Sequence, residues 1–136
     1  MSYSIADLTC LGPGVARMLK SVGIRTTGKL LEAAKNPKGR KALSSKTGYD
    51  EAQILRWANL ADRMRIRGVR EPYAELLRAA GVETIRDLKY RNPCNLAKAM
   101  ADANTRRKLV RFLPSENMIE QWIEDAKKLQ PKITYR

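Results

Sequence analysis

The sequence predicts an all-α protein of about eight helices, arranged in two similar halves on one core. Apolar residues recur at helical spacing, proline and glycine mark helix starts and ends, and no segment alternates apolar and polar residues over a convincing length. The 136 residues are about one domain long. We therefore expect a single domain, residues 1–136, with internal repeats over about 5–65 and 66–130 and a short C-terminal tail, 131–136.

The first expected feature is a glycine turn that leads into a short helix. Gly12 and Gly14 tolerate backbone angles that other residues avoid, and Pro13 suits the first turn of a helix. Thr26 is a candidate N-cap for a second short helix. The first helix keeps its apolar residues on one face and stops at a glycine: Ala16, Leu19, Val22 and Gly23.

This opening stretch recurs 58 residues later. The identical pairs are Ala16 and Ala74, Leu19 and Leu77, Gly23 and Gly81, Thr26 and Thr84, and Leu30 and Leu88. Because these positions set a helix face, its stop and the next N-cap, the repeat predicts two units with the same local structure.

Each half continues with two further helices. Asn36-Pro37 and Asn92-Pro93 each predict an N-cap followed by proline at the first helical position. We expect helices of some ten residues from there, which end near Gly48 and near Asn104. A linking segment rich in Arg and Lys, Thr105–Leu113, follows the second of them.

The last helix of each half is amphipathic. It starts at Asp50 in the first half and at Ser115 in the second, and both share the spacing Ile-x-x-Trp-x-x-x-Ala. The apolar neighbours at helical spacing favour Trp57 and Trp122 as core anchors over platforms for base stacking. With Phe112 as the single phenylalanine, the core is expected to be mostly aliphatic.

The opening stretch resembles the helix-hairpin-helix motif of DNA repair and replication proteins. The motif's loop reads hydrophobic-Gly-hydrophobic-Gly, with an alanine four residues later. Leu11, Gly12 and Ala16 match it, and Cys10 replaces the first glycine. In the second copy Gly68 matches the first glycine and Arg70 replaces the second. The resemblance implies phosphate binding by backbone amides at a helix N-terminus, without sequence reading.

Residues 5 to 130 also resemble, as a whole, an uncharacterised bacterial family of tandem helix-hairpin-helix-like repeats. The resemblance is carried by the segments LGPGVARMLKSVGIRTTGKLLEAA, AELLRAAGVETIRDL and LVRFLPS. The family is a domain of unknown function, so it implies the fold and leaves the function to the hairpins.

Positive charge is concentrated on the part of the chain that contains the two loops. The net charge is +13, from 27 basic and 14 acidic residues. Residues 1–65 carry 12 basic and 5 acidic side chains, residues 66–114 carry 11 and 5, and residues 115–136 carry 4 and 4. This excess favours a polyanionic partner.

Three basic clusters accompany the loops. They are Arg63, Arg65, Arg67 and Arg70 around the second loop; Lys35, Lys38, Arg40 and Lys41 around the Asn36-Pro37 helix start; and Arg106, Arg107, Lys108 and Arg111. Each cluster has a plainer interpretation as a solvated helix face. The predicted nucleic-acid-binding residues are Gly12, Gly14, Arg17, Lys20, Arg65, Arg67, Gly68, Arg70, Arg106, Arg107 and Lys108.

The composition argues against several other classes. The chain has no histidine, which is the commonest general base, and Cys10 and Cys94 form no metal-ligand pattern, so we expect no enzyme, cofactor or metal site. Cys10 is expected to be a buried small hydrophobe, with a reactive thiol as the alternative. No signal peptide and no run of about 20 apolar residues is visible, which predicts a cytoplasmic protein without a membrane partner.

These observations predict a non-catalytic protein that binds nucleic acid independently of sequence. Duplex DNA is favoured over RNA, with each loop on a phosphate run of opposite strands. The alternative is a helical adaptor that docks on an acidic protein partner and in which the hairpins are purely structural. The sequence leaves the oligomeric state open.

Overall fold

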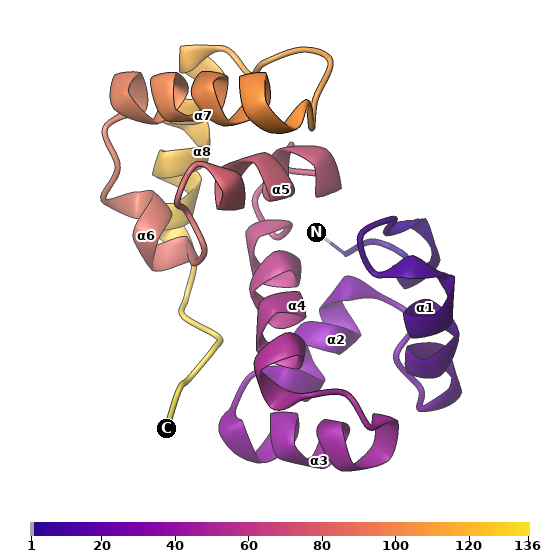
Figure 1. Cartoon of the computed structure of the whole chain (residues 1–136). Helices are drawn as coiled ribbons and strands as arrows, with labels where there is room; N and C mark the ends of the chain where they lie inside the picture. Colours follow the sequence, from indigo (N-terminus) through magenta and orange to yellow (C-terminus); the bar gives the residue numbers. More distant parts are fainter. Residues whose placement is uncertain (1) are drawn as a thin grey trace. The chain divides into compact units, whose positions relative to one another are not determined.

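The computed structural model describes residues 2–136, and over these residues the chain is helical, with no named strand. The chain divides into two compact units (Figure 1). The first consists of the described part of Met1–Asp62 together with Pro131–Arg136, and the second of Arg63–Gln130. The all-α prediction is confirmed. The predicted junction between the halves, at 65/66, lies close to the boundary between the units.

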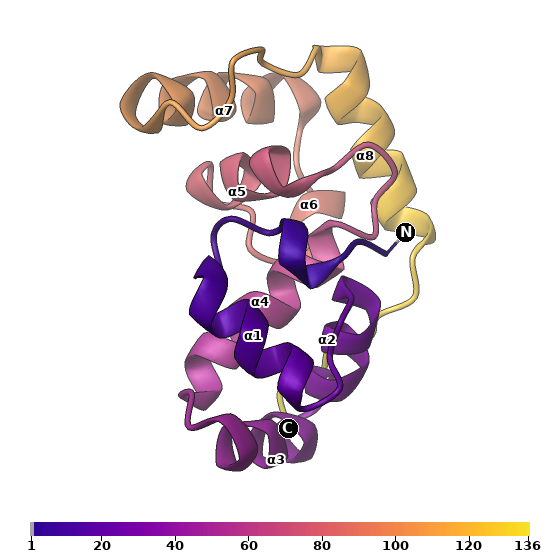
Figure 2. The same ribbon diagram turned by 90° about the vertical axis from the view of Figure 1, so that its right-hand side faces the viewer.

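The first unit contains η1 (Ile5–Asp7), a 3-10 helix, followed by α1 (Gly12–Ser21), α2 (Thr27–Ala34), α3 (Pro37–Thr47) and α4 (Glu51–Arg63), whose last residue belongs to the second unit. The second unit contains α5 (Glu71–Ala79), α6 (Ile85–Lys89), α7 (Pro93–Arg107) and α8 (Glu116–Lys128). Within the first unit, η1 packs against α1, and α2 against α3 (Figures 1 and 2). Within the second, α8 packs against both α6 and α7, and α5 packs against α7.

Polar side chains cap the starts of most helices, as the sequence predicts. The Thr26 hydroxyl accepts a hydrogen bond from the Lys29 amide (3.1 Å), and Thr84 forms a reciprocal capping box with Asp87. Asn36, Asn92 and Ser115 cap α3, α7 and α8. Each cap satisfies an amide that the first helical turn leaves without a partner.

Helix α7 is longer than predicted. It continues past Asn104 to Arg107, and Lys108 caps it in the left-handed region at φ 50°. Asn104 therefore does not stop the helix. Its side-chain amide donates to the Val110 carbonyl (3.1 Å) and its carbonyl accepts from the Val110 amide (3.0 Å). The linking segment expected at Thr105–Leu113 thus begins with a helical turn. Its later part is held by the hydrogen bonds between Asn104 and Val110.

The cores of the two units are mainly aliphatic, and each contains one of the tryptophans. Trp57 is 9% exposed and Trp122 is 2% exposed, so both predicted anchors are confirmed. The Tyr49 ring meets Trp57 edge to face at 5.2 Å, and the Tyr73 ring lies 5.3 Å from Trp122. Burying one large apolar side chain stabilises a fold by about 1.5–3 kcal/mol.

The C-terminal tail packs on the first unit. The Thr134 amide donates to the Lys35 carbonyl (2.7 Å), and the Arg40 guanidinium donates to the Thr134 carbonyl (2.7 Å). Arg40 also lies over the Tyr135 ring at 5.9 Å. Nothing in the composition of residues 131–136 indicated these contacts, because most of them are to backbone carbonyls.

Candidate nucleic-acid interface

The first loop joins η1 to α1 and is held by two apolar side chains. Leu8 and Leu11 are buried, whereas Cys10 between them is exposed. The prediction that Cys10 is a buried small hydrophobe is therefore wrong: the turn directs the two leucines into the core and Cys10 outward. Gly12 takes φ +79° at the first position of α1, and its amide donates to the Thr9 carbonyl (3.3 Å).

The start of α1 has no side-chain cap. Its N-cap residue is Leu11, which makes no capping hydrogen bond, and Pro13 has no amide hydrogen. The first amides of a helix have no intrahelical partner, and Gly14 is exposed in this first turn. Nothing lies within 4 Å of a Cβ built on Gly12 or Gly14. The loop therefore presents bare backbone at the positive end of the helix dipole, where an anion is favoured.

The two cations predicted for this loop lie at different ends of α1. Arg17 is exposed and lies one turn after Gly14. Lys20 is half-buried and lies in the last turn, where a cation is favoured by the opposite end of the dipole. Lys20 lies six positions after Gly14, which corresponds to about 9 Å along the helix axis. Of the two, only Arg17 is placed next to the loop.

The second loop joins α4 to α5 through a different turn. Ile66 and Val69 are buried, and Gly68 between them is exposed with φ +86°. The positive φ thus falls at the position of Cys10 in the 58-residue register, and not at that of Gly12. A Cβ on Gly68 would lie 3.5 Å from Nε1 of Trp122, so this loop packs against α8.

The start of α5 also lacks a side-chain cap. Its N-cap is Arg70, in extended conformation at φ −90° and ψ 177°, and no side chain accepts an amide hydrogen there. Glu71 and Pro72 follow in the first turn. The first loop therefore offers amides without side chains, and the second places an exposed arginine at the same point.

The arginines around the second loop have different roles. Arg63 is fully buried: its Nε donates to the Ala74 carbonyl (3.0 Å) and its Nη1 to the Glu83 carbonyl (2.7 Å). Although Arg63 belongs to the basic cluster around the second loop, its guanidinium is used inside the second unit. Arg65 is half-buried, with both terminal nitrogens 3.3 Å from the Gln130 carbonyl.

Arg67 and Arg70 are exposed, and they line different grooves. The groove beside Arg67 contains Gln121 and Asp125 of α8, so its charge is mixed. The groove beside Arg70 has a volume of about 410 Å³ and no acidic residue in its lining. The side of the loop that carries Arg70 is therefore the more favourable for an anion.

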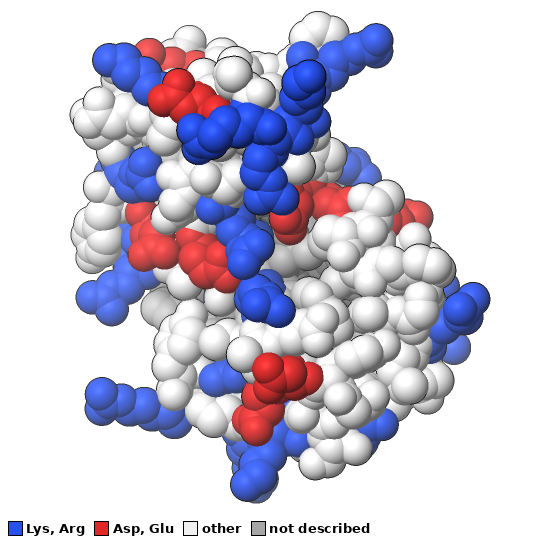
Figure 3. Space-filling model, in the orientation of Figure 1, with Lys and Arg blue, Asp and Glu red and all other residues white. Residues whose placement is uncertain are grey.

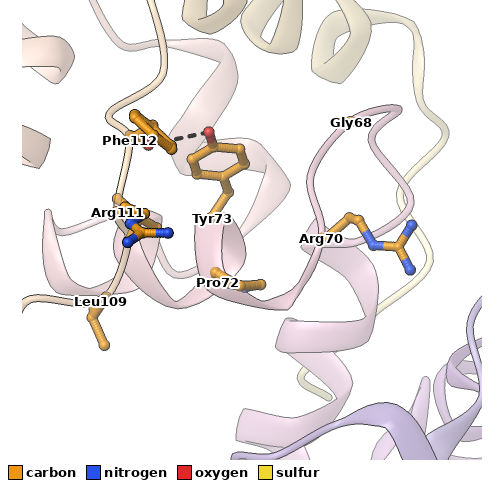
Figure 4. A pocket seen from close by; sticks show the side chains of 8 residues that line it. Gly68, Arg70, Pro72, Tyr73, Leu109, Arg111 and Phe112 are labelled. Atoms are coloured by element: carbon orange, nitrogen blue, oxygen red, sulfur yellow. Dashed lines mark hydrogen bonds between the residues drawn. The ribbon is translucent and has the colours of Figure 1, made fainter.

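The groove beside Arg70 brings together segments that are distant in the sequence. One wall is the second loop and the start of α5, and the other is the segment after α7 (Figure 4). Its lining consists of Gly68, Arg70, Pro72, Tyr73, Leu109, Val110, Arg111 and Phe112. The Tyr73 hydroxyl donates to the Phe112 carbonyl (3.2 Å) and joins the two walls.

Arg106, Arg107 and Lys108 precede this segment and are all exposed. The two arginines lie in the last turn of α7 and Lys108 is its C-cap, where the helix dipole favours cations. Figure 3 shows Lys and Arg side chains gathered over this end of α7 and the adjoining segment. The structure thus places the predicted basic run beside the groove that contains Arg70.

The basic cluster at the start of α3 is partly used within the fold. Lys35 forms an ion pair with Glu32 at 2.6 Å, and this hydrogen bond lowers the pKa of the Glu32 carboxyl. Arg40 is buried and donates to the Ala34 carbonyl (2.9 Å). These four basic residues therefore do not form one exposed cluster. Only Lys38 and Lys41 are exposed.

Sequence reasoning missed the aromatic part of this region. It assigned no role to Tyr73, and it counted Phe112 toward the composition of the core. Phe112 is 74% exposed. A signal was present, because Phe112 stands between a basic run and Pro114, outside any apolar helical pattern.

The fold and the two loops define an all-α protein with two uncapped, exposed helix starts. The chain belongs to the family described as Domain of unknown function (DUF4332), whose model matches residues 9–129. Neither the curated proteins nor the solved structures contain a significant match to the chain. None of the described helices is long and apolar enough to cross a membrane, and residues 2–136 contain no group of three or more side chains suited to holding a metal ion.

Proposed function

We propose that this protein binds nucleic acid, with duplex DNA as the preferred form, through phosphates and without reading sequence. The observation that carries the proposal is the capping pattern. Side chains cap α2, α3, α6, α7 and α8, and none caps α1 or α5, the two helices that follow the hairpin loops. Both loops correspond to the helix-hairpin-helix resemblance, in which a helix start receives a phosphate.

The charge and exposure of the second unit support the same function. Arg67, Arg70 and Arg111 are exposed around one loop, and Arg106, Arg107 and Lys108 extend the basic surface. Arginine suits phosphate because its planar group donates two parallel hydrogen bonds. Contacts to phosphate position the nucleic acid without specifying its sequence.

Fluorescence anisotropy with a labelled duplex of about 20 bp tests the proposal across salt concentrations of about 50 to 300 mM. If five to seven phosphates are neutralised, log K falls with log salt at a slope of about −4.5 to −6. We expect Arg67→Ala combined with Arg70→Ala to weaken binding by about tenfold or more at about 0.1 M salt and to reduce the slope by about 1.8.

The matched control is Arg56→Ala combined with Arg86→Ala. Both residues are exposed arginines on α4 and α6, outside the two loops. This control removes the same charge, so it should change binding much less. Absence of duplex binding at low salt contradicts the proposal. Capture of a protein that survives high salt and nuclease treatment, without nucleic-acid binding, supports the adaptor alternative.

A further inference from the structure

The groove between the start of α5 and the segment after α7 has two kinds of lining. Its apolar part comes from Pro72, Tyr73, Leu109, Val110 and Phe112, and its charged part from Arg70 and Arg111. Figure 4 shows Phe112 and Arg111 on the extended segment beside Tyr73, whereas the Arg70 side chain extends from its loop away from these rings. Apolar and aromatic surface next to arginine matches a nucleotide, which has a flat base and an anionic phosphate.

Phe112 is exposed, yet the backbone that carries it is fixed. Its side chain is 74% exposed, in a chain whose other large apolar side chains are mostly buried. Tyr73 holds its carbonyl, and Asn104 holds both backbone groups of Val110, two residues earlier. The ring is therefore presented to solvent from an anchored segment, which limits the entropy that a bound partner must remove.

The charge around the ring selects the kind of partner. None of the lining residues is acidic, and three exposed cations, Arg106, Arg107 and Lys108, precede the segment. Proteins that bind single strands combine a cationic groove for the backbone with aromatic rings on which bases stack. Here both parts occur within one groove.

We propose that this groove takes an unpaired base of a bound nucleic acid, at a strand end or a distorted site. The base stacks on Phe112, and Arg111 and Arg70 contact the flanking phosphates. This inference rests on the proposed function and deepens it, because it adds a preference for a junction between duplex and single strand. The second loop, with Arg67, holds the duplex phosphates, and the groove beside it takes the base that leaves the stack.

The test compares two labelled probes by anisotropy: a blunt duplex, and the same duplex with a 3′ overhang of about five nucleotides. A longer blunt duplex with the same number of phosphates controls for charge. Stacking of one base contributes at least about fivefold to affinity, so the overhang probe should bind at least about fivefold more tightly than the matched duplex.

Phe112→Ala should remove this preference and leave blunt-duplex binding unchanged, whereas Phe112→Trp should keep it because tryptophan also stacks. The control is Tyr90→Ala, since Tyr90 is 75% exposed in the same unit and lies outside the groove. Tyr90→Ala should leave binding to both probes unchanged. Phe112 is exposed, so its loss does not endanger folding.

The outcomes separate the two proposals. If no probe binds, the proposed function fails, and this inference fails with it. If the duplex binds with no preference for the overhang, and Phe112→Ala behaves like Tyr90→Ala, the inference alone is overturned. That second result would assign the exposed ring to another occupant, such as a protein segment.

Discussion

The loops that precede α1 and α5 align in sequence but present different surfaces at the start of the helix that follows. In the first loop, α1 begins with Gly12-Pro13-Gly14, and the two glycines leave their backbone uncovered by side chains. In the second loop, α5 begins after Arg70, and a long cationic side chain occupies the position that corresponds to Gly12. The first loop can bring an anion close to amides, and the second reaches an anion with a guanidinium.

The loops are also anchored differently from within. In the 58-residue register, Ile5 corresponds to Arg63, and both side chains are fully buried. Ile5 fills its position with an apolar side chain, whereas Arg63 binds two backbone carbonyls. At this pair of aligned positions, burial is shared and the chemistry of the side chain is not.

The largest effect should come from the buried anchor of the second loop. Arg63→Ala removes the guanidinium that donates to the carbonyls of Ala74 and Glu83 and creates a cavity, so we expect a loss of about 3 kcal/mol in the free energy of unfolding. Urea denaturation measures the loss, and amide hydrogen exchange should locate it in α5 and α6. The neighbouring exposed variant Arg67→Ala should stay within about 0.5 kcal/mol of wild type. If Arg63→Ala and Arg67→Ala were equally stable, Arg63 would not be the buried anchor of the second loop.

Much of the fold could be predicted from this sequence because helix signals are local. Threonine, asparagine and serine N-caps act within three residues, so Thr26, Asn36, Asn92 and Ser115 were identifiable. The end of α7 could not be predicted in this way. The Asn104 side chain forms two hydrogen bonds with the Val110 backbone, across a turn that the sequence does not define.

The candidate site was harder to predict than the fold. The sequence alone does not distinguish a buried arginine from an exposed one. Only the structure separates Arg63 and Arg40, which bind carbonyls, from Arg67 and Arg70, which are exposed. The groove could not be predicted from the sequence for a further reason. Tyr73 and Phe112 are 39 residues apart and are joined by a hydrogen bond to a backbone carbonyl.

The next effect tests the bare backbone of the first loop. Gly12 has φ +79° and Gly14 does not have a positive φ, while both have open space around a Cβ. Gly12→Ala should therefore cost about 1–2 kcal/mol of stability through the left-handed backbone alone. Gly14→Ala should raise stability by up to about 1 kcal/mol, because alanine loses less entropy in a helix.

Binding should separate these two glycine variants from a purely structural loop. The added methyl group of Gly14→Ala lies beside the amides proposed to receive a phosphate, so the more stable variant should bind the duplex more weakly. Thermal unfolding and anisotropy on the same samples measure both quantities. Unchanged affinity in Gly14→Ala would assign the first loop to helix packing.

The smallest effect concerns the cap that α5 lacks. Arg70 already has the extended backbone of an N-cap residue, so Arg70→Ser places a hydroxyl where it can accept a hydrogen bond from the first turn of α5. We expect a gain of about 0.5–1 kcal/mol in stability relative to Arg70→Ala, measured by urea denaturation. Both variants lose the same charge, so both should show the same weaker salt dependence of duplex binding.

The first loop cannot be altered in this way, because Leu11 is buried and has helical backbone angles. If Arg70→Ser stabilises α5 and binds the duplex more weakly than Arg70→Ala, the helix start is left uncapped for its ligand. A serine that stabilises α5 without any loss of affinity would limit phosphate binding to the first loop.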